Sequence, residues 1–337
     1  MHPEFSGEWD EYAIGEILSI GNGRDYKHLH NGDIPVFGTG GYMTSVDDFL
    51  YDGESVFVGR KGTINKPLYY NGKFWTVDTL FYTYNFTDVL PKFVYCLFQT
   101  INWLKYNEAS GVPSLSKATI EKIKVRIPSM DEQDKLSNLL FLLDKRIEVQ
   151  NKIIEKLETL IKGIIETVIS LQKPNTFIKD CLECNSSILQ ESQVAEYGAS
   201  PVYGATGITG YTEAADVNGE SILIIKDGSG VGTVKYVTGE YSYIGTLNRL
   251  IAKDGYYLKY IYFALQGFSF EPYKTGMAIP HIYFKDYGKA KIFCPTIEKQ
   301  SAIAQKLSST EDKVSVEKQI LFYYQVQKSY LLSQMLI

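Results

Sequence analysis

Residues 130–172 read MDEQDKLSNLLFLLDKRIEVQNKIIEKLETLIKGIIETVISLQ, and apolar residues recur in them at every third or fourth position. In order, this stripe comprises Leu136, Leu140, Leu143, Ile147, Gln150, Ile154, Leu157, Ile161, Ile164, Val168 and Leu171. Steps that alternate between four and three residues form the seam of a coiled coil, so the stretch predicts one long helix. At ~1.5 Å per residue, the helix would span roughly 54 Å from Leu136 to Leu171.

A second, weaker stripe in the same phase lies near the C-terminus. Its positions, each 167 residues after one of the first stripe, are Ile303, Leu307, Thr310, Val314, Glu317, Leu321, Tyr324, Lys328, Leu331 and Met335. Neither helix alone has anything against which to bury its stripe, so we expect the two helices to pack on each other. A globular segment separates them in the sequence and the chain must return along the seam, which predicts an antiparallel coiled coil.

Gln150 and Glu317 occupy equivalent positions of the two stripes. A polar residue at a seam position can fix the register of a coiled coil at some cost in stability. The alternative is that both side chains simply face solvent near a point where the helices cross. The sequence leaves both interpretations open.

The rest of the chain repeats with the same offset. Residues 35–38 (PVFG) recur at 201–204 (PVYG), an offset of 166, and residues 92–99 recur at 259–266, an offset of 167. Further pairs at an offset of 167 are Pro113 and Pro280, Pro128 and Pro295, and Gln133 and Gln300. A constant offset over a whole domain indicates a tandem repeat.

Each repeat has a globular part followed by a long helix. Short strand-like runs such as 55–58 and 221–225 alternate with turns rich in Gly, Asn and Asp, and one short helix is predicted at about 89–106 and 256–267. The predicted fold is α+β: two similar mixed α/β domains separated by two long helices packed as an antiparallel coiled coil, with pseudo-twofold symmetry. The predicted segments are residues 1–129, 130–172, 173–296 and 297–337.

The composition is typical of a globular protein. Hydrophobic residues make up 45% and charged residues 22% of the chain, and no apolar run reaches the ~18 residues of a membrane span. The N-terminus has no secretion signal, so we expect a cytoplasmic protein without a membrane segment. The formal net charge of −5 does not by itself point to a nucleic-acid partner: were the chain to bind DNA, positive charge would have to come from local loops or from a partner chain.

A signature follows the short helix of the first repeat. It runs from residues 111–117 (GVPSLSK) through 123–128 (IKVRIP) to Glu132-Gln133 at the start of the long helix. The pattern resembles the conserved-region signature of specificity subunits of type I restriction–modification systems. A second copy begins at residues 276–280 and is similar, although Ala278-Ile279 is inserted in its Gly–Pro loop.

The resemblance implies two target-recognition domains, at 1–129 and 173–296, with the long helices as conserved spacers. It implies a non-catalytic subunit that binds double-stranded DNA, docks two methyltransferase subunits and is joined by motor–nuclease subunits. S-adenosylmethionine, ATP and Mg²⁺ are then expected in those partner subunits and no cofactor in this chain. Two diverged domains on a rod that covers roughly 16 base pairs, at ~3.4 Å per pair, predict a bipartite and asymmetric target. Apolar residues outside the seam that are candidates for docking are Leu139, Phe141, Phe322 and Tyr323.

Candidate DNA contacts follow from local chemistry. The loop from Gly59 to Trp75 is basic and lacks acidic residues, and its counterpart at 226–235 is rich in glycine but less basic. Arg or Lys can address guanine edges and Asn adenine edges, so the candidates for base contact are Arg60, Lys61, Asn65, Lys226, Lys235, Asn248 and Arg249, with Ser229 as a further DNA contact. Candidates for phosphate contact are Lys27, Lys66, Lys73, Lys105 and Lys274.

Signatures of catalysis are missing from the sequence. It has no Asn/Asp-Pro-Pro-aromatic motif of an amino-methyltransferase and no G-x-x-x-x-G-K-[S/T] nucleotide loop. Cys181 and Cys184 form a C-x-x-C pair, but a zinc site would need a second pair or two nearby histidines. We therefore expect neither an active site nor a metal site.

Two other functions are compatible with the sequence. The same fold would serve as the specificity subunit of a restriction system in which methylase and nuclease are fused in one chain. An adaptor is the alternative from another class: a coiled-coil protein whose globular ends bind proteins and not DNA. The adaptor predicts no sequence preference on DNA, and it has no need for two similar domains at a constant offset.

Overall fold

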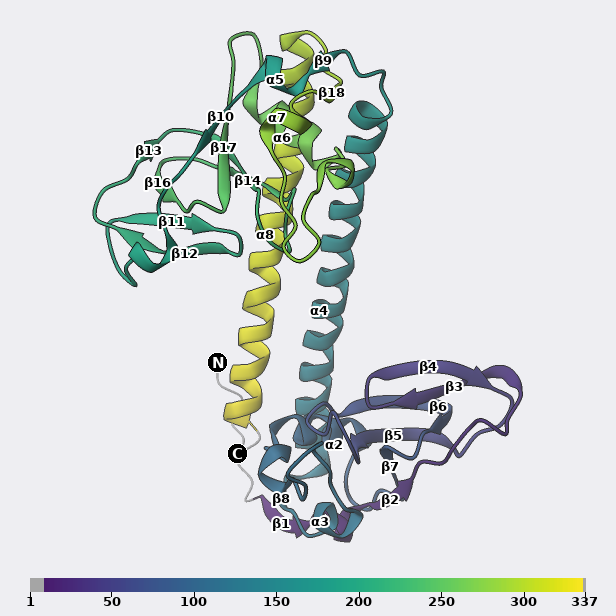
Figure 1. Ribbon diagram of the computed structural model, residues 1–337. Helices are drawn as coiled ribbons and strands as arrows, with labels where there is room; N and C mark the ends of the chain where they lie inside the picture. Colours follow the sequence, from purple (N-terminus) through teal and green to yellow (C-terminus); the bar gives the residue numbers. More distant parts are fainter. Residues whose placement is uncertain (1–8, 336–337) are drawn as a thin grey trace. The chain divides into compact units, whose positions relative to one another are not determined.

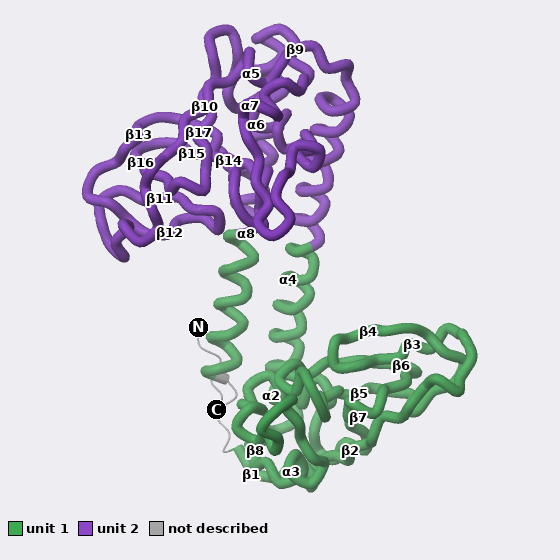
Figure 2. Tube along the Cα trace, in the orientation of Figure 1, with its two compact units in different colours: residues 1–151, 319–337 green, residues 152–318 purple. Residues whose placement is uncertain are grey.

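The computed structural model describes residues 9–335 of the chain. The chain forms two compact units: unit 1 comprises residues 1–151 and 319–337, and unit 2 comprises residues 152–318 (Figure 1, Figure 2). Each unit combines a domain of short helices and sheets with one segment of each long helix. This organisation confirms the predicted α+β fold with a tandem repeat.

Unit 1 contains a six-stranded sheet in the order β2-β7-β5-β6-β3-β4. Its strands are β2 (Ser19–Asn22), β3 (Asn31–Gly38), β4 (Gly41–Val46), β5 (Tyr51–Gly59), β6 (Leu68–Thr76) and β7 (Leu80–Tyr84). A separate antiparallel pair joins β1 (Asp10–Ala13) and β8 (Lys124–Ile127). The short helices are α1 (Ile14–Ile17), α2 (Pro91–Thr100), the 3-10 turn η1 (Trp103–Tyr106) and α3 (Lys117–Glu121).

Unit 2 contains two four-stranded sheets, in the orders β10-β17-β14-β15 and β12-β11-β16-β13. Their strands are β10 (Leu182–Ser186), β11 (Ser200–Gly204), β12 (Gly207–Thr212), β13 (Val217–Asn218), β14 (Ser221–Ile225), β15 (Val234–Val237), β16 (Glu240–Tyr243) and β17 (Leu247–Ala252). A small pair joins β9 (Thr176–Phe177) and β18 (Lys291–Ile292). The short helices are α5 (Ile178–Cys181), η3 (Glu191–Gln193), α6 (Leu258–Gln266), η4 (Glu271–Tyr273) and α7 (Phe284–Tyr287).

The predicted short helices are found at equivalent places in the two units. Helix α2 packs on β5 in unit 1, and α6 packs on β14 in unit 2. Each also contributes to a core that includes part of a long helix: Phe93 of α2 shares a buried cluster with Leu140, and Phe263 of α6 shares one with Leu307. In both units the short helix therefore connects the sheet to the coiled coil through apolar packing.

The two long helices are α4 (Met130–Ile164) and α8 (Ile297–Met335). Within unit 1 their segments run in opposite directions, because Asp144 pairs with Lys328 whereas the later Arg146 lies over the ring of the earlier Tyr324. The predicted antiparallel packing is confirmed. The seam positions that the structure places inside are Leu136, Leu140, Leu143, Gln150, Ile154, Leu307 and Val314. Those it leaves half-buried are Ile147, Leu157, Ile161, Ile164, Ile303, Thr310, Glu317, Leu321, Tyr324, Lys328 and Leu331, and the side chain of Met335 lies outside the described residues.

The seam residues Gln150 and Glu317 belong to different units. Gln150 is buried in unit 1, and Glu317 is half-buried in unit 2. The interpretation that both side chains face solvent therefore does not hold for Gln150. Burial of a polar side chain in an apolar seam is the arrangement that fixes register.

The weakest positions of the second stripe are polar residues with hydrogen-bond partners. The Nζ of Lys328 donates to Oε1 of Gln99 at 2.6 Å and forms an ion pair with Asp144. The hydroxyl of Thr310 donates to the carbonyl oxygen of Lys306 at 3.0 Å. Because the polar groups have partners, neither residue prevents the helices from packing.

The end of the first stripe differs from the prediction. Helix α4 continues into a π-helix, η2 (Ile165–Ser170), and each turn of a π-helix holds about one more residue than an α-helical turn. The stripe is rotated as a result: Ile165 and Ile169 are buried, whereas Val168 and Leu171 are 38% and 71% exposed. The prediction that Val168 and Leu171 belong to the seam is therefore wrong.

A buried glutamine joins each long helix to the short helix of its unit. Oε1 of Gln133 accepts a hydrogen bond from the N–H of Leu90 at 2.8 Å, and its Nε2 donates to the carbonyl of Pro128 at 3.0 Å. In unit 2, Oε1 of Gln300 accepts from the N–H of Tyr257 at 3.0 Å. Leu90 and Tyr257 directly precede α2 and α6, so each glutamine caps the start of the short helix.

Replacing Gln133 with leucine is expected to lower the free energy of unfolding by about 2 kcal/mol, because the N–H of Leu90 loses its acceptor. Urea unfolding of the full chain measures the change. Gln325→Leu on the exposed side of α8 is the control, since it should change stability by less than about 0.5 kcal/mol. Equal stability of the two variants would contradict the capping role.

Candidate nucleic-acid interface

The basic loop of unit 1 leaves β5 and is held by main-chain hydrogen bonds to two other segments. The N–H of Arg60 donates to the carbonyl of Thr79 at 2.8 Å, and the carbonyl of Arg60 accepts from the N–H of Leu115 at 2.9 Å. The N–H of Gly62 donates to the carbonyl of Pro113 at 2.8 Å. Residues 60–62 are thereby fixed between the turn that precedes β7 and the Gly–Pro loop.

Unit 2 contains the same set of bonds. The N–H of Lys226 donates to the carbonyl of Thr246 at 3.0 Å, and its carbonyl accepts from the N–H of Ile282 at 2.9 Å. The N–H of Gly228 donates to the carbonyl of Pro280 at 2.9 Å. Each residue lies 166 or 167 positions after its counterpart in unit 1, so Arg60 and Lys226 occupy equivalent places. We call each set a Gly–Pro clamp. The clamp of unit 1 comprises residues 60–62, Thr79, Pro113 and Leu115, and the clamp of unit 2 comprises residues 226–228, Thr246, Pro280 and Ile282.

Each clamp requires a glycine. Gly62 and Gly228 have φ angles of +94° and +101°, a region of backbone conformation that other residues rarely adopt. At Gly62 the nearest atom to an added β-carbon would be Oγ1 of Thr39, at 3.7 Å, so space is available and the backbone angle is the constraint.

Gly62→Ala is expected to cost about 1 kcal/mol of folding free energy because alanine disfavours this backbone angle. The change is measurable by urea unfolding of the full chain. Gly40→Ala is the control, since Gly40 has an ordinary φ and no atom within 4 Å of an added β-carbon. If the two variants lose the same stability, the clamp does not depend on the left-handed angle.

A hollow of about 720 Å³ lies beside the clamp of unit 1. Its charged lining residues are Arg60, Lys61, Lys117 and Glu108. Hydrogen bonds from Thr119 and Ser116 lower the pKa of the Glu108 carboxyl, so this group is a negative charge of the lining at neutral pH, as an ordinary glutamate would be. Lys117 is paired with Glu121 at 3.6 Å, so the excess of positive charge at the hollow comes from Arg60 and Lys61 against Glu108. This sign favours an anionic ligand such as the DNA backbone.

The clamp of unit 2 presents different side chains. Lys226 is half-buried, and the residue after it is Asp227, which forms a β-bridge with His281. Lys274 forms an ion pair with Glu271, three residues earlier. Two equivalent backbone frames thus carry an Arg-Lys pair in unit 1 and a Lys-Asp pair in unit 2.

A family model described as the type I restriction modification DNA specificity domain matches residues 6–159 and again residues 175–322. The chain belongs to this family. Its members supply the DNA sequence specificity of type I restriction–modification systems, and the double match follows the tandem repeat seen in the sequence and in the two clamps.

Solved structures of such proteins share the fold. The S subunit of a type I restriction–modification system from M. genitalium matches with a TM-score of 0.77 at 16% identity, over 100% of this chain and 98% of that chain. A chain from work on complex assembly and conformational transition of the type I R-M system matches with a TM-score of 0.55 at 12% identity, over 97% of each chain. At these identities the likeness concerns the fold alone. No protein with a curated description matches the sequence significantly.

The other candidate contacts of this specificity chain in unit 1 are dispersed. Asn65 and Lys66 are exposed on the same loop as Arg60, and Lys27 is exposed between β2 and β3. The Nζ of Lys73, on β6, lies 4.9 Å from the ring centre of Phe49. Lys105 lines a different hollow, together with Lys124 and Arg126. The structure therefore brings Arg60 and Lys61 together at the clamp and does not bring Lys105 to it.

The candidates of unit 2 fall into two groups. Ser229 and Lys235 are exposed, and Nζ of Lys235 lies 4.6 Å from the ring centre of Tyr203. Asn248 is buried, and its Oδ1 accepts a hydrogen bond from the hydroxyl of Ser186 at 2.8 Å. Nε of Arg249 donates to the hydroxyl of Ser221 at 2.7 Å. A base could reach Asn248 only after rearrangement of the sheet, so we do not include Asn248 in the interface, whereas the half-buried Arg249 stays a prediction.

Lys117 is a candidate that the sequence analysis missed. It lies at the first position of α3 and lines the hollow with Arg60 and Lys61, and it also pairs with Glu121 at 3.6 Å. The available signal was its place in the Gly–Pro signature, four residues after Pro113. The main-chain hydrogen bonds of the clamp hold the loop after Pro113 against the basic loop, and this contact places Lys117 near Arg60 and Lys61.

The long helices of this specificity chain carry exposed apolar side chains. Leu139, Phe322 and Tyr323 are exposed. Phe141, in contrast, packs edge-on against Tyr69 with ring centres 5.0 Å apart and belongs to the boundary of the unit 1 core. The first three remain candidates for docking, and the prediction for Phe141 is wrong because its ring is used within the unit.

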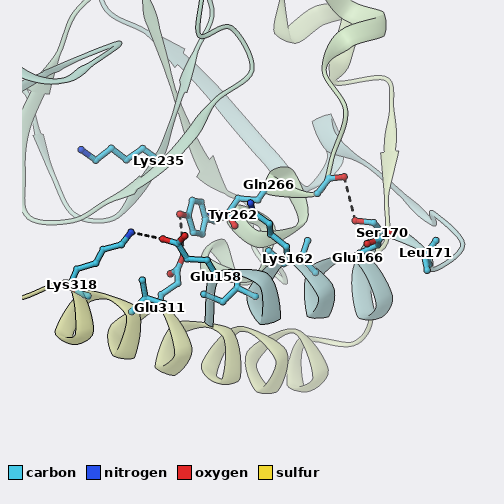
Figure 3. Close-up of a pocket in the computed structure, with 15 residues that line it drawn as sticks. Glu158, Lys162, Glu166, Ser170, Leu171, Lys235, Tyr262, Gln266, Glu311 and Lys318 are labelled. Carbon is cyan, nitrogen blue, oxygen red and sulfur yellow. Dashed lines mark hydrogen bonds and ion pairs between the residues drawn. The ribbon is translucent and has the colours of Figure 1, made fainter. Parts of the chain in front are cut away.

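Unit 2 has a groove of about 1330 Å³ beside its segments of the long helices (Figure 3). Its apolar lining residues include Ile161, Ile165 and Val314. Charged residues line it as well: Lys318 pairs with Glu158 at 2.6 Å, and the hydroxyl of Tyr262 donates to Glu311 at 3.3 Å (Figure 3). Apolar surface with a polar surround is the composition of protein-docking sites.

Two further properties concern the described residues 9–335. No group of three or more His, Cys, Asp or Glu side chains among them is arranged to hold a metal ion. No helix in this part of the chain is both long enough and apolar enough to cross a membrane.

Proposed function

We propose that each unit of this specificity chain binds one half of a bipartite, asymmetric DNA target, with the Gly–Pro clamp at the centre of each contact. The observation that carries the proposal is the equivalence of the two clamps. The same main-chain frame presents Arg60 and Lys61 in one unit and Lys226 and Asp227 in the other. Equivalent frames with different side chains favour recognition of two different half-sites.

The chemistry of these side chains suggests their roles. Arginine and lysine can address the O6 and N7 of guanine, so Arg60 and Lys61 favour a half-site that contains guanine. A carboxylate can accept from the N4 amino group of cytosine, which is the role proposed for Asp227. Lys27, Lys66, Lys73 and Lys117 are suited to phosphate contacts, which orient the protein on the duplex.

The long helices are the proposed docking surface for partner subunits. Exposed Leu139, Phe322 and Tyr323 and the groove of unit 2 offer apolar surface of the kind that protein partners bury. We propose that two methyltransferase subunits dock there and that motor–nuclease subunits join them. The chain itself would then be non-catalytic, S-adenosylmethionine, ATP and Mg²⁺ would act in the partners, and the complex would work in the cytoplasm.

Two alternatives predict different partners. A specificity subunit for a fused methylase–nuclease would keep both clamps and bind a single kind of partner chain. A coiled-coil adaptor that does not bind DNA is disfavoured by membership in the specificity family. Two observations distinguish these alternatives from the main proposal: which partner chain co-purifies, and whether a methylated motif is present.

Co-expression of the chain with its methyltransferase in a host without DNA methylation tests the proposed function. Methylated bases are then mapped over the whole genome. We expect one new asymmetric motif, with two short half-sites separated by unspecified bases. A soluble complex that methylates no motif, or a motif of a single uninterrupted site, would contradict the proposal.

A further inference from the structure

The Gly–Pro loop of unit 2 is a closed loop with fixed ends. The N–H of Thr275 donates to the carbonyl of His281 at 2.9 Å, and the N–H of His281 donates back to the carbonyl of Thr275 at 2.8 Å. Gly276 has a φ of +88°, and an added β-carbon there would lie 2.3 Å from the carbonyl oxygen of Ile279. The clamp bond from Gly228 to Pro280 fixes the same loop to the glycine-rich segment that follows β14.

The tip of this loop is apolar and exposed. The side chain of Met277 is fully exposed, and that of Ile279 is 66% exposed. Neither carries a hydrogen-bonding group, and Ala278 between them is exposed as well. Solvent-exposed apolar side chains on a loop whose ends are fixed indicate a contact surface for a partner.

The surroundings of the tip indicate that the partner is DNA. The clamp places the loop against the main chain of Lys226, whereas Lys274, which directly precedes the bridge that closes the loop, is paired with Glu271. The glycine-rich segment beside it, residues 228–232, carries only the small side chains of Ser229 and Val231, and Val231 is buried. Main chain without bulky side chains allows close approach of a phosphate backbone, and Lys226 carries positive charge beside it.

Unit 1 has a shorter loop at the equivalent place. Its Gly–Pro segment is Gly111-Val112-Pro113, which lacks the two residues that Ala278-Ile279 add in unit 2. Val112 is exposed, but it is the one apolar side chain between the glycine and the proline. The tip of the loop therefore carries two large exposed apolar side chains in unit 2 and one in unit 1.

We propose that Met277 and Ile279 form an apolar wedge that enters the second half-site and unstacks a base step there. Methionine, isoleucine and proline are among the side chains that act in this way in DNA-binding proteins, where unstacking of a base step allows the DNA to bend onto the protein. The inference rests on the proposed function and adds to it: specificity at this half-site includes the deformability of one base step, such as a pyrimidine–purine step.

The test uses the full chain in complex with its methyltransferase and a synthetic duplex that carries the mapped motif. 2-Aminopurine replaces one adenine at a time in the second half-site and beside it, apart from the base that becomes methylated. We expect binding of the unaltered complex to raise the fluorescence several-fold at one step. The double variant Met277→Ser with Ile279→Ser should lose most of that rise and bind the duplex about tenfold more weakly, because the buried apolar contact is gone.

Ile188→Ser is the matched control. Ile188 is almost fully exposed and apolar, lies in the same unit, and is outside the Gly–Pro loop, so this variant should keep both the fluorescence rise and the affinity. A bound, active complex without any fluorescence rise, or a double variant that keeps the full rise, would overturn the wedge and leave the proposed function intact. A complex that recognises no bipartite motif would overturn the proposed function and the wedge with it.

Discussion

Reversal of charge at both Arg60 and Lys61, by Arg60→Glu with Lys61→Glu, is expected to reduce methylation of the target more than about 100-fold. Both side chains line the hollow at the clamp of unit 1, and the change replaces two attractive charges by two repulsive ones. The main-chain bonds of the clamp are retained, so the chain should still fold and assemble with its partner. Genome-wide mapping of methylated bases and the affinity for the mapped duplex measure the effect.

The control for this variant has the same change of net charge elsewhere in unit 1. Lys122 and Lys135 are exposed and outside the hollow, so Lys122→Glu with Lys135→Glu should reduce methylation far less. If methylation by the clamp variant equals that of the control, the clamp of unit 1 does not contact the target. Loss of assembly in the clamp variant would contradict the claim that its frame is independent of these side chains.

Leu143→Asp is expected to lower the free energy of unfolding by about 4 kcal/mol or more, since it removes a buried leucine and places a carboxylate in the seam. Leu142, its neighbour on α4, is half-exposed, so Leu142→Asp should cost less than about 1 kcal/mol. Urea unfolding of the two variants of the full chain compares them directly. Similar losses at the two positions would mean that the seam does not lie on the face assigned to it.

The coiled coil was predictable because the spacing of its apolar residues can be read from neighbouring positions and persists over many residues. Alternating steps of four and three residues identify α4, and the offset of 167 finds α8 even though Thr310 and Lys328 interrupt its stripe. The π-helix was not predicted, because nothing in the local spacing of apolar residues distinguishes it from a continuing α-helix. Gly267 lies against it, where an added β-carbon would be 2.3 Å from Oγ of Ser170 and 2.8 Å from Cγ2 of Ile165.

The candidate site was predictable only in part. Residue type and the lack of acidic neighbours selected the loop of Arg60 and Lys61, and the structure exposes both residues. The same criteria selected Asn248, which is buried in the sheet and accepts a hydrogen bond from Ser186. The type of a residue indicates what its side chain can bind, but the direction in which that side chain points depends on how the strands pair. Lys117 was missed for the related reason that a main-chain bond, invisible in the sequence, brings its loop to the site.

The Gly–Pro clamps are built from main-chain donors and acceptors, and this has an evolutionary consequence. Substitution at positions 60, 61, 226 or 227 leaves every bond of the frame in place, because each bond uses an N–H or a carbonyl that almost any residue supplies. If the clamps contact DNA as proposed, drift at these four positions would change the preferred DNA sequence at little cost to folding. Selection can then act on recognition almost independently of stability, so a lineage can acquire new targets through single substitutions without passing through unfolded intermediates.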